Sequence, residues 1–156
     1  MSNVLVTYFS ASGVTKGIAE KIASENDYDI FEIVPEEIYT PEDLDWTNKN
    51  SRSTIEMNDK SFRPPIADTT DVSGYDTVVI GFPVWWYTVP TIINTFIEQN
   101  DLKNKDIYVF VTSGSSSYES SFNDLKTTYG DLNFVSGIRL TGLESVDDIV
   151  KWIEFT

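Results

Sequence analysis

The chain has 156 residues, of which 40% are hydrophobic, so it is long enough to form one domain with a buried core. Its 25 acidic and 11 basic residues give a formal net charge of −14, which argues against nucleic acid or an anionic membrane surface as a partner. Cysteine and histidine are both absent, which excludes disulfides, thiol nucleophiles, Ser-His-Asp triads and most transition-metal sites.

Such a charge favours basic or mixed-charge protein partners, with encounter rates that fall as the salt concentration rises. Redox or group chemistry would come largely from a bound cofactor, or from carboxylates and hydroxyls, and we predict no metal site and no catalytic side chain. The N-terminus lacks the charged segment of a signal peptide. The longest nearly apolar stretch, 77–93, contains Gly81, Pro83 and Pro90 and is too short to span a bilayer. We therefore expect a cytoplasmic protein.

The first predicted element is an apolar strand over 4–9, followed directly by a helix whose apolar stripe begins at Val14. Gly17 weakens this helix, which predicts close packing of the helix on the sheet at that position. A second strand is predicted over 28–34, where Glu32 interrupts the apolar run.

Residues 35–75 break the alternation of strands and helices with four prolines and scattered charges. This segment is too long to be a bare loop in a compact domain. We expect an irregular cover that contains one short helix near 52–60 and is anchored by Trp46 and Phe62.

A third strand is predicted over 77–82, and a helix follows over 89–99, with Pro90 suited to its first turn. The fourth strand covers 106–111 and leads into a loop of small residues at 112–117.

The next helix begins with a capping box, Ser116-x-x-Glu119, and ends at Gly130. A fifth strand, over 134–140, is interrupted by two small residues. A last helix is predicted to start near Ser145.

Alternating strands and helices predict an α/β fold with helices on both faces of a parallel sheet. The first, third and fourth strands are densely apolar, as central strands are, whereas the second and fifth are interrupted, as edge strands are. This favours a three-layer α/β/α sandwich with strand order 2-1-3-4-5, formed by a single domain over 1–156. The ligand crevice of such a sheet lies over the carboxyl ends of its first, third and fourth strands.

Three loops meet at this predicted crevice: 10–15, 83–88 and 112–118. The first offers hydroxyl groups and the free N–H groups of a helix N-terminus, which suit a phosphate. It lacks both GxxxxGK[ST] and GxGxxG, so a phosphate monoester fits better than a nucleoside triphosphate or a dinucleotide. The simpler alternative is that Ser12 and Thr15 only cap the helix.

The second loop carries three consecutive aromatic residues, Trp85, Trp86 and Tyr87, whose flat rings suit stacking on a flavin. Alternatively, one tryptophan lies in the core and the other at a protein interface. Small residues in the third loop let its backbone approach a ring edge, which Tyr118 could also reach. The alternative there is a plain helix N-cap at Ser116.

Three motifs resemble the flavodoxin family: YFSASGVTK at 8–16, GFPVWWYTVP at 81–90 and TSGSS at 112–116. The first matches the family's phosphate loop, while the Pro-x-Trp-Trp loop and YTPEDLDW at 39–46 resemble a flavodoxin-like branch common in bacteria. The resemblance implies FMN, with its phosphate on the first loop and its ring between the other two. The predicted cofactor-binding residues are Ser10, Ala11, Ser12, Gly13, Val14, Thr15, Pro83, Val84, Trp85, Trp86, Tyr87, Thr88, Thr112, Ser113, Gly114, Ser115 and Tyr118.

The resemblance also implies a flavoprotein that carries electrons one at a time between redox partners, as a monomer or weak dimer, more a redox carrier than a self-contained enzyme. Only Lys16 lies near the predicted phosphate loop, so we expect a low potential for the second electron. The main alternative is an FMN-dependent NAD(P)H or quinone oxidoreductase, in which Arg52 and Arg63 could contact a 2′-phosphate.

A second alternative is a flavin-free interaction module. A response regulator shares the strand order but needs acidic residues at the strand ends. Ser10, Pro83 and Thr112 occupy those positions here, so this version fits poorly.

Overall fold

The computed structural model describes residues 4–10, 13–26, 28–37, 39–45, 47–59, 61–68, 70–84, 89–112, 118–141 and 152. In chain order, the elements of these parts are β1 (Val4–Tyr8), α1 (Val14–Asn26), β2 (Asp29–Glu32), α2 (Arg52–Asn58), β3 (Thr77–Pro83), α3 (Thr91–Gln99), β4 (Asp106–Thr112), α4 (Glu119–Thr128) and β5 (Asn133–Arg139). The predicted strands are all present, with ends that shift by one or two residues, β2 being the most shortened.

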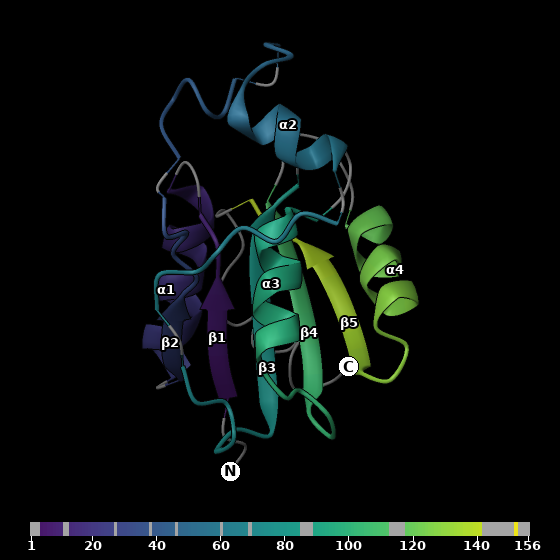
Figure 1. The fold of residues 1–156 in the computed structure, drawn as a ribbon. Coiled ribbons are helices and arrows are strands. Elements are labelled where there is room, and N and C mark those ends of the chain that lie inside the picture. Colours follow the sequence, from purple (N-terminus) through teal and green to yellow (C-terminus); the bar gives the residue numbers. More distant parts are fainter. Residues whose placement is uncertain are drawn as a thin grey trace.

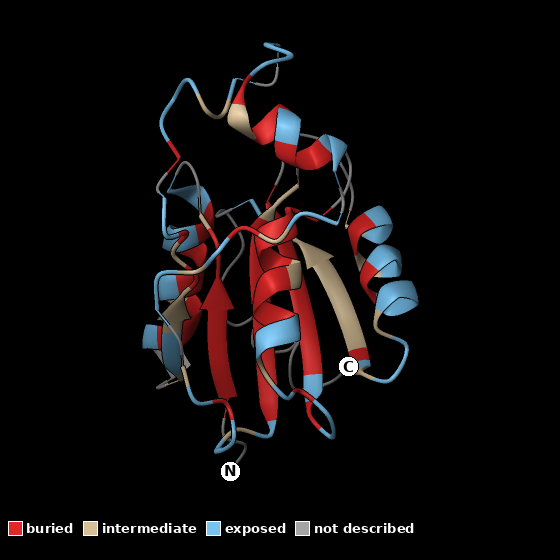
Figure 2. Cartoon of the chain, viewed as in Figure 1, coloured by how far each residue is buried: buried red, intermediate tan, exposed pale blue. Residues whose placement is uncertain are grey.

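The five strands form one parallel sheet in the order β2-β1-β3-β4-β5, which confirms the predicted topology (Figure 1). All residues of β1 are buried, and β3 and β4 each have one position that is not. Both edge strands are mostly half-buried or exposed, as their interrupted sequences predicted (Figure 2). At β5 the pairing with β4 slips by one residue, and Val135 is the extra residue in the ladder.

Two hydrophobic cores lie on opposite faces of the sheet because successive side chains of a strand point to opposite faces. In β3, Val78 and Ile80 belong to the core that α3 and α4 cover, whereas Val79 belongs to the core under α1. Gly81 leaves room for the neighbouring strand's Phe110, since a Cβ at this position would lie only 2.1 Å from that ring. The helices therefore form the outer layers of the predicted three-layer sandwich.

The segment after β2 contains the predicted short helix, α2, which lies beyond the carboxyl ends of the strands (Figure 1). Ser51 caps this helix by accepting a hydrogen bond from the N–H of Thr54. The segment is anchored by Tyr39, whose ring packs edge-to-face against Phe9, and by the buried side chain of Met57.

The prediction that Phe62 anchors this segment is wrong, because its side chain is 41% exposed. The chain turns at Asp59, which accepts hydrogen bonds from the N–H and hydroxyl groups of Ser61 and from the N–H of Phe62. The turn directs the Phe62 ring to the surface. The other predicted anchor, Trp46, lies outside the described residues.

Two expectations for α1 are also wrong. Gly17 is exposed, and a Cβ there would have no heavy atom within 4 Å, so no close packing on the sheet requires a glycine. Val14 is 51% exposed, because it occupies the first turn, beyond the part of the helix that covers the sheet.

α4 starts later than the capping box predicted. Tyr118 occupies the N-cap position, and Glu119 is the first helical residue rather than the third. Tyr118 packs against Gly137 of β5, where a Cβ would come within 2.7 Å of the tyrosine ring. Of the predicted last helix only Trp152 is described, and its indole N–H donates to the hydroxyl of Ser136. None of the helices in the described parts has the length and apolar character needed to cross a bilayer.

Candidate functional site

Thr112, the last residue of β4, contacts residues of the other two predicted loops. Its backbone carbonyl accepts a hydrogen bond of 3.0 Å from the N–H of Val84, just after β3. Its hydroxyl lies 2.8 Å from that of Thr15 in the first turn of α1. Both threonines are buried, with 6% and 2% of their surface exposed. The loops therefore start from adjacent points at one edge of the sheet.

The turn between β1 and α1 depends on the backbone conformation of a glycine. Gly13 has a φ of +94°, a conformation that other residues adopt only with strain. Its N–H donates to the hydroxyl oxygen of Ser10 at 3.0 Å, and its carbonyl accepts the first hydrogen bond of α1, from Gly17. A Cβ at Gly13 would meet no atom within 4 Å, so the space beside the turn is free of described protein atoms.

This turn has the chemistry of an anion site. The first N–H groups of a helix have no partner within the helix, and they carry the positive end of its dipole. Gly13 and Val14 are both exposed, so the start of α1 faces solvent. Lys16, also exposed, adds one positive charge nearby. A phosphate monoester is small enough to use such a turn without the lysine-bearing loop of a nucleotide triphosphatase.

The structure describes part of the predicted set, namely Ser10, Gly13, Val14, Thr15, Pro83, Val84, Thr112 and Tyr118. The remaining members lie outside the described residues: Ala11, Ser12, Trp85, Trp86, Tyr87, Thr88, Ser113, Gly114 and Ser115. Their contacts with a ligand stay predictions.

Two of the described members have roles that sequence reasoning did not foresee. Thr15 was predicted as a phosphate ligand, and its hydroxyl also joins α1 to β4 through Thr112. The sequence held no signal for this pairing, because the two threonines follow the first and fourth strands, which the third strand separates in the predicted sheet. Tyr118 packs edge-to-face on Phe122, with 6.1 Å between ring centroids, and its contact with a flavin stays a prediction.

The charges near the end of β1 are mainly negative. Burial, together with the charge of Glu32, raises the pKa of Tyr8 far above its usual value, so its hydroxyl stays neutral. No arginine lies in the described part of the 10–15 loop. The site therefore offers dipoles and hydroxyl groups to an anion rather than strong counter-charge.

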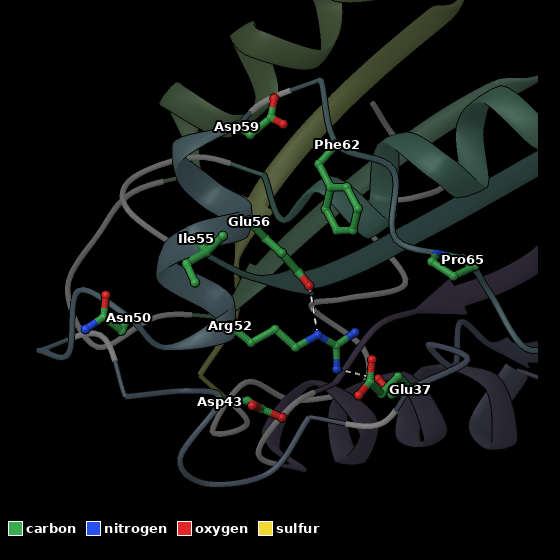
Figure 3. A pocket seen from close by; sticks show the side chains of 9 residues that line it. All are labelled: Glu37, Asp43, Asn50, Arg52, Ile55, Glu56, Asp59, Phe62 and Pro65. Atoms are coloured by element: carbon green, nitrogen blue, oxygen red, sulfur yellow. Dashed lines mark hydrogen bonds and ion pairs between the residues drawn. The ribbon is translucent and has the colours of Figure 1, made fainter.

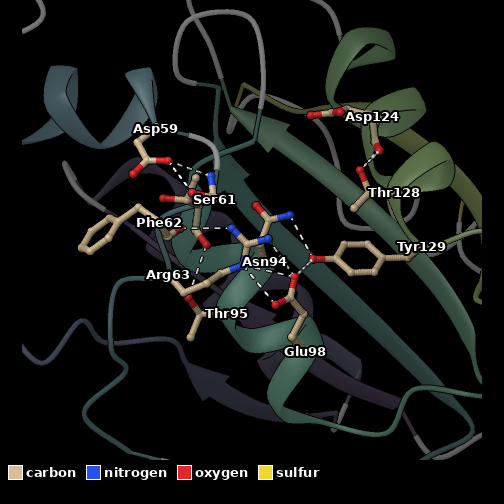
Figure 4. A network of polar contacts seen from close by, with 11 residues as sticks. Asp59, Ser61, Phe62, Arg63, Asn94, Thr95, Glu98, Asp124, Thr128 and Tyr129 are labelled. Carbon is tan, nitrogen blue, oxygen red and sulfur yellow. Dashed lines mark hydrogen bonds and ion pairs between the residues drawn. The ribbon is translucent and has the colours of Figure 1, made fainter.

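Neither of the arginines considered for a 2′-phosphate is free. Arg63 makes a two-pronged ion pair with Glu98 of α3 at 3.0 to 3.1 Å, and Tyr129 also donates to this carboxylate (Figure 4). These two donors lower the pKa of Glu98. Arg52 pairs with Glu56 at 2.8 Å in α2, and its guanidinium lies 3.8 Å from the centroid of the Tyr39 ring. A 2′-phosphate would have to displace a carboxylate at either arginine.

Comparisons with known proteins agree with the fold and identify the family. A flavodoxin family model matches residues 3–156. A candidate flavoprotein from Bacteroides eggerthii is 46% identical, with a TM-score of 0.95 over 99% of this chain and 98% of that one. Another, from Bacteroides uniformis, is 42% identical, with a TM-score of 0.92 over 98% of both chains.

A flavoprotein from Lactobacillus acidophilus, solved in complex with FMN, is 28% identical, with a TM-score of 0.74 over 99% of this chain and 100% of that one. No curated protein matches the chain. Since the family model spans nearly every residue and the sheet has the strand order that the motifs predicted, the chain belongs to the flavodoxin family.

Proposed function

We propose that the protein binds FMN and transfers electrons one at a time between redox partners. The observation that carries the proposal is the meeting of the three loops at Thr112, beside an open turn at the N-terminus of α1. The FMN complex of the Lactobacillus acidophilus flavoprotein, which aligns over nearly the full length, supports the choice of cofactor.

The residues present fit the phosphate of FMN. The Ser10 hydroxyl already orients the turn, and the first N–H groups of α1 would donate to the phosphate oxygens. The 83–88 and 112–118 loops would hold the isoalloxazine ring, which supplies the electron-transfer chemistry when bound. In this chain the protein's part is to bind, orient and exclude water.

Two features support a carrier over a self-contained enzyme. Cysteine and histidine are absent, so the side chain used most often for proton transfer, histidine, is missing. In addition, Arg52 and Arg63 are paired with carboxylates, which weakens the case for an NADPH site built on them. Flavin reduction within seconds of mixing with NADH or NADPH alone would favour the oxidoreductase instead.

The first experiment compares FMN with riboflavin, which lacks the phosphate. We expect a yellow holoprotein after mixing with FMN, and fluorescence titration should give an affinity for riboflavin that is at least tenfold weaker. Equal affinities would contradict phosphate binding at the turn, and a colourless protein that ignores FMN would support the flavin-free alternative.

A second experiment separates the two roles of Thr15. If its hydroxyl acts only through Thr112, the variants Thr15→Val and Thr112→Val should weaken FMN binding equally. The double variant should then have the same affinity for FMN as either single variant. If Thr15 also contacts the phosphate, Thr15→Val should be the more damaging for FMN, and the two variants should become equal for riboflavin. Retention of full FMN affinity in both variants would contradict the proposed site.

The charge distribution also predicts a low potential for the second electron. With an effective dielectric constant near 20, two like charges about 10 Å apart repel by about 1.7 kcal/mol. Only Lys16 offsets the phosphate in the described part of the turn, and the formal net charge is −14. A redox titration should therefore place the second potential below that of free FMN, and a value at or above it would contradict this account.

A further inference from the structure

A hollow of about 520 Å³ lies beside α2 (Figure 3). This helix lies at the same end of the sheet as the proposed cofactor site (Figure 1). We call the cavity beside it the α2 hollow. Its described lining residues are Glu37, Asp43, Asn50, Arg52, Ile55, Glu56, Asp59, Phe62 and Pro65. The volume is within the range of sites that bind small ligands, so it also has room for a side chain of a partner.

Two large apolar side chains in the hollow are open to solvent. Ile55 projects from α2 with 57% of its surface exposed, and Phe62 lies across from the helix (Figure 3). The buried residues of α2 include Thr54 and Met57, so Ile55 contributes little to the core. Exposed apolar residues that gather in one depression, bordered by polar residues, are typical of an interaction site.

The hollow is also strongly acidic. Four carboxylates against one guanidinium give its described lining a formal charge of −3. Arg52 pairs with Glu56, donates to the backbone carbonyl of Glu37 and stacks on Tyr39. This leaves three carboxylates in excess in the described lining. Hydrogen bonds from Ser61 lower the pKa of Asp59, so this border carboxylate is ionised at neutral pH.

The hollow has a fixed position relative to the sheet. Arg63, next to Phe62, is bound to Glu98 of α3 (Figure 4). Pro35 and Ile66 form an antiparallel bridge where the segment leaves and rejoins the body of the protein. These contacts keep the apolar and acidic groups in place for a partner that approaches the loop end of the sheet.

We propose that the α2 hollow is the docking site for a basic redox protein, which inserts a lysine or arginine side chain. The apolar stem of that side chain packs against Ile55 and Phe62, and its cation lies beside the carboxylate of Asp59 at the C-terminal end of α2. Glu37 and Asp43 border the other end of the helix and attract further basic groups of the partner (Figure 3). The inference rests on the proposed function, since the partner exchanges electrons with bound FMN. A protein occupant is favoured because both apolar side chains remain exposed and accessible to a second surface.

The test measures electron transfer from the FMN-loaded, reduced protein to a lysine-rich c-type cytochrome in a stopped-flow instrument. The double variant Asp43→Asn/Asp59→Asn removes two border charges. Asp101→Asn/Asp131→Asn removes the same charge from exposed positions at the opposite edge of the sheet. At low salt we expect the first variant to slow the second-order rate about tenfold and the matched control less than twofold.

Two further measurements identify what the hollow binds. Ile55→Ser/Phe62→Ser should weaken binding of the cytochrome to the flavin-free protein, measured by calorimetry. The change of this affinity with salt concentration should stay the same as in the natural protein. Reduction of benzoquinone, a neutral acceptor, should proceed at the same rate in all variants, which checks that the flavin is intact.

Equal slowing by the two charge variants would overturn the proposal, because net charge alone would then explain the rate. Tight binding of benzylammonium in the hollow, without competition by the cytochrome, would also overturn it in favour of a small-molecule site. Failure of the proposed function has a different signature: no flavin is retained, while binding of the cytochrome to the flavin-free protein still reports on the hollow.

Discussion

Gly17→Ala is expected to stabilise the protein, because this glycine lies in α1 without any steric need for it. It is exposed, and an added Cβ would have no heavy atom within 4 Å. Its backbone is helical, and its N–H donates to the carbonyl of Gly13. Alanine is more favourable than glycine in a helix by about 0.5–1 kcal/mol, since it loses less backbone freedom on folding. The free energy of unfolding should rise by about this amount.

Gly13→Ala is the matched control. A Cβ at Gly13 likewise meets nothing within 4 Å, so neither variant changes packing. Gly13, however, has a φ of +94°, and the left-handed conformation costs an alanine roughly 1–2 kcal/mol. The two alanines lie four residues apart and should therefore change stability in opposite directions through the backbone alone.

Urea unfolding of the flavin-free protein at pH 7, followed by circular dichroism, measures both changes. The slope of the transition should stay constant while the midpoint moves. In a thermal scan Gly17→Ala should raise the midpoint by about 1–4 °C for a chain of this size. If Gly17→Ala instead destabilises the protein by more than about 0.5 kcal/mol, the helix packs closely there, as the sequence predicted, and the exposed placement is wrong.

Three further substitutions test the packing and the polar network. Gly81→Ala should destabilise the protein by at least about 1–3 kcal/mol, because its Cβ would overlap the Phe110 ring; unchanged urea unfolding would contradict this packing. Glu98→Gln should cost less than about 1 kcal/mol at pH 7, since its ion pair with Arg63 is partly exposed. Because the pKa of Glu98 is lowered in the folded state, the stability difference between the natural protein and Glu98→Gln should be complete above pH 4.5 and shrink as the pH falls below it. A stability difference that persists at lower pH would refute this role of the ion pair. Burial raises the pKa of Tyr129 from 10.0 to about 12, so its stabilising effect is complete below pH 10 and is lost as the pH rises toward 12. Between pH 9 and pH 11 the free energy of unfolding should fall more for the natural protein than for Tyr129→Phe. Equal decreases in the two proteins would exclude this role of Tyr129.

The fold was predictable because its signals are periodic and local. Dense apolar runs marked the central strands, and their interruptions marked β2 and β5 as edges. The prediction for Gly17 failed for a different reason. The buried residues of α1, among them Ile18, Ile22 and Ala23, define the face that covers the sheet, and Gly17 lies outside it. At Gly13, by contrast, the positive φ follows from its place in a strand-to-helix turn.

The candidate site was predictable as a place but not as a network. The order of the strands brings the three loops to one edge, and this order could be inferred from hydrophobicity. The hydrogen bond between Thr15 and Thr112 joins residues 97 positions apart, and its geometry depends on the packing of α1 on the sheet. Phe62 escaped prediction because a turn at Asp59, rather than hydrophobicity, determines the direction of its side chain.

The small ladder that closes the segment between β2 and β3 has a consequence for how this architecture can vary. The N–H of Glu36 donates to the carbonyl of Pro65, and the N–H of Ala67 donates to that of Val34. The two ends of the excursion are thus joined by backbone hydrogen bonds that do not depend on the side chains between them. Exposed positions of this excursion, such as Ile55 and Phe62, can therefore change without disturbing the core contact of Tyr39 with Phe9, so this surface can vary while the fold is kept.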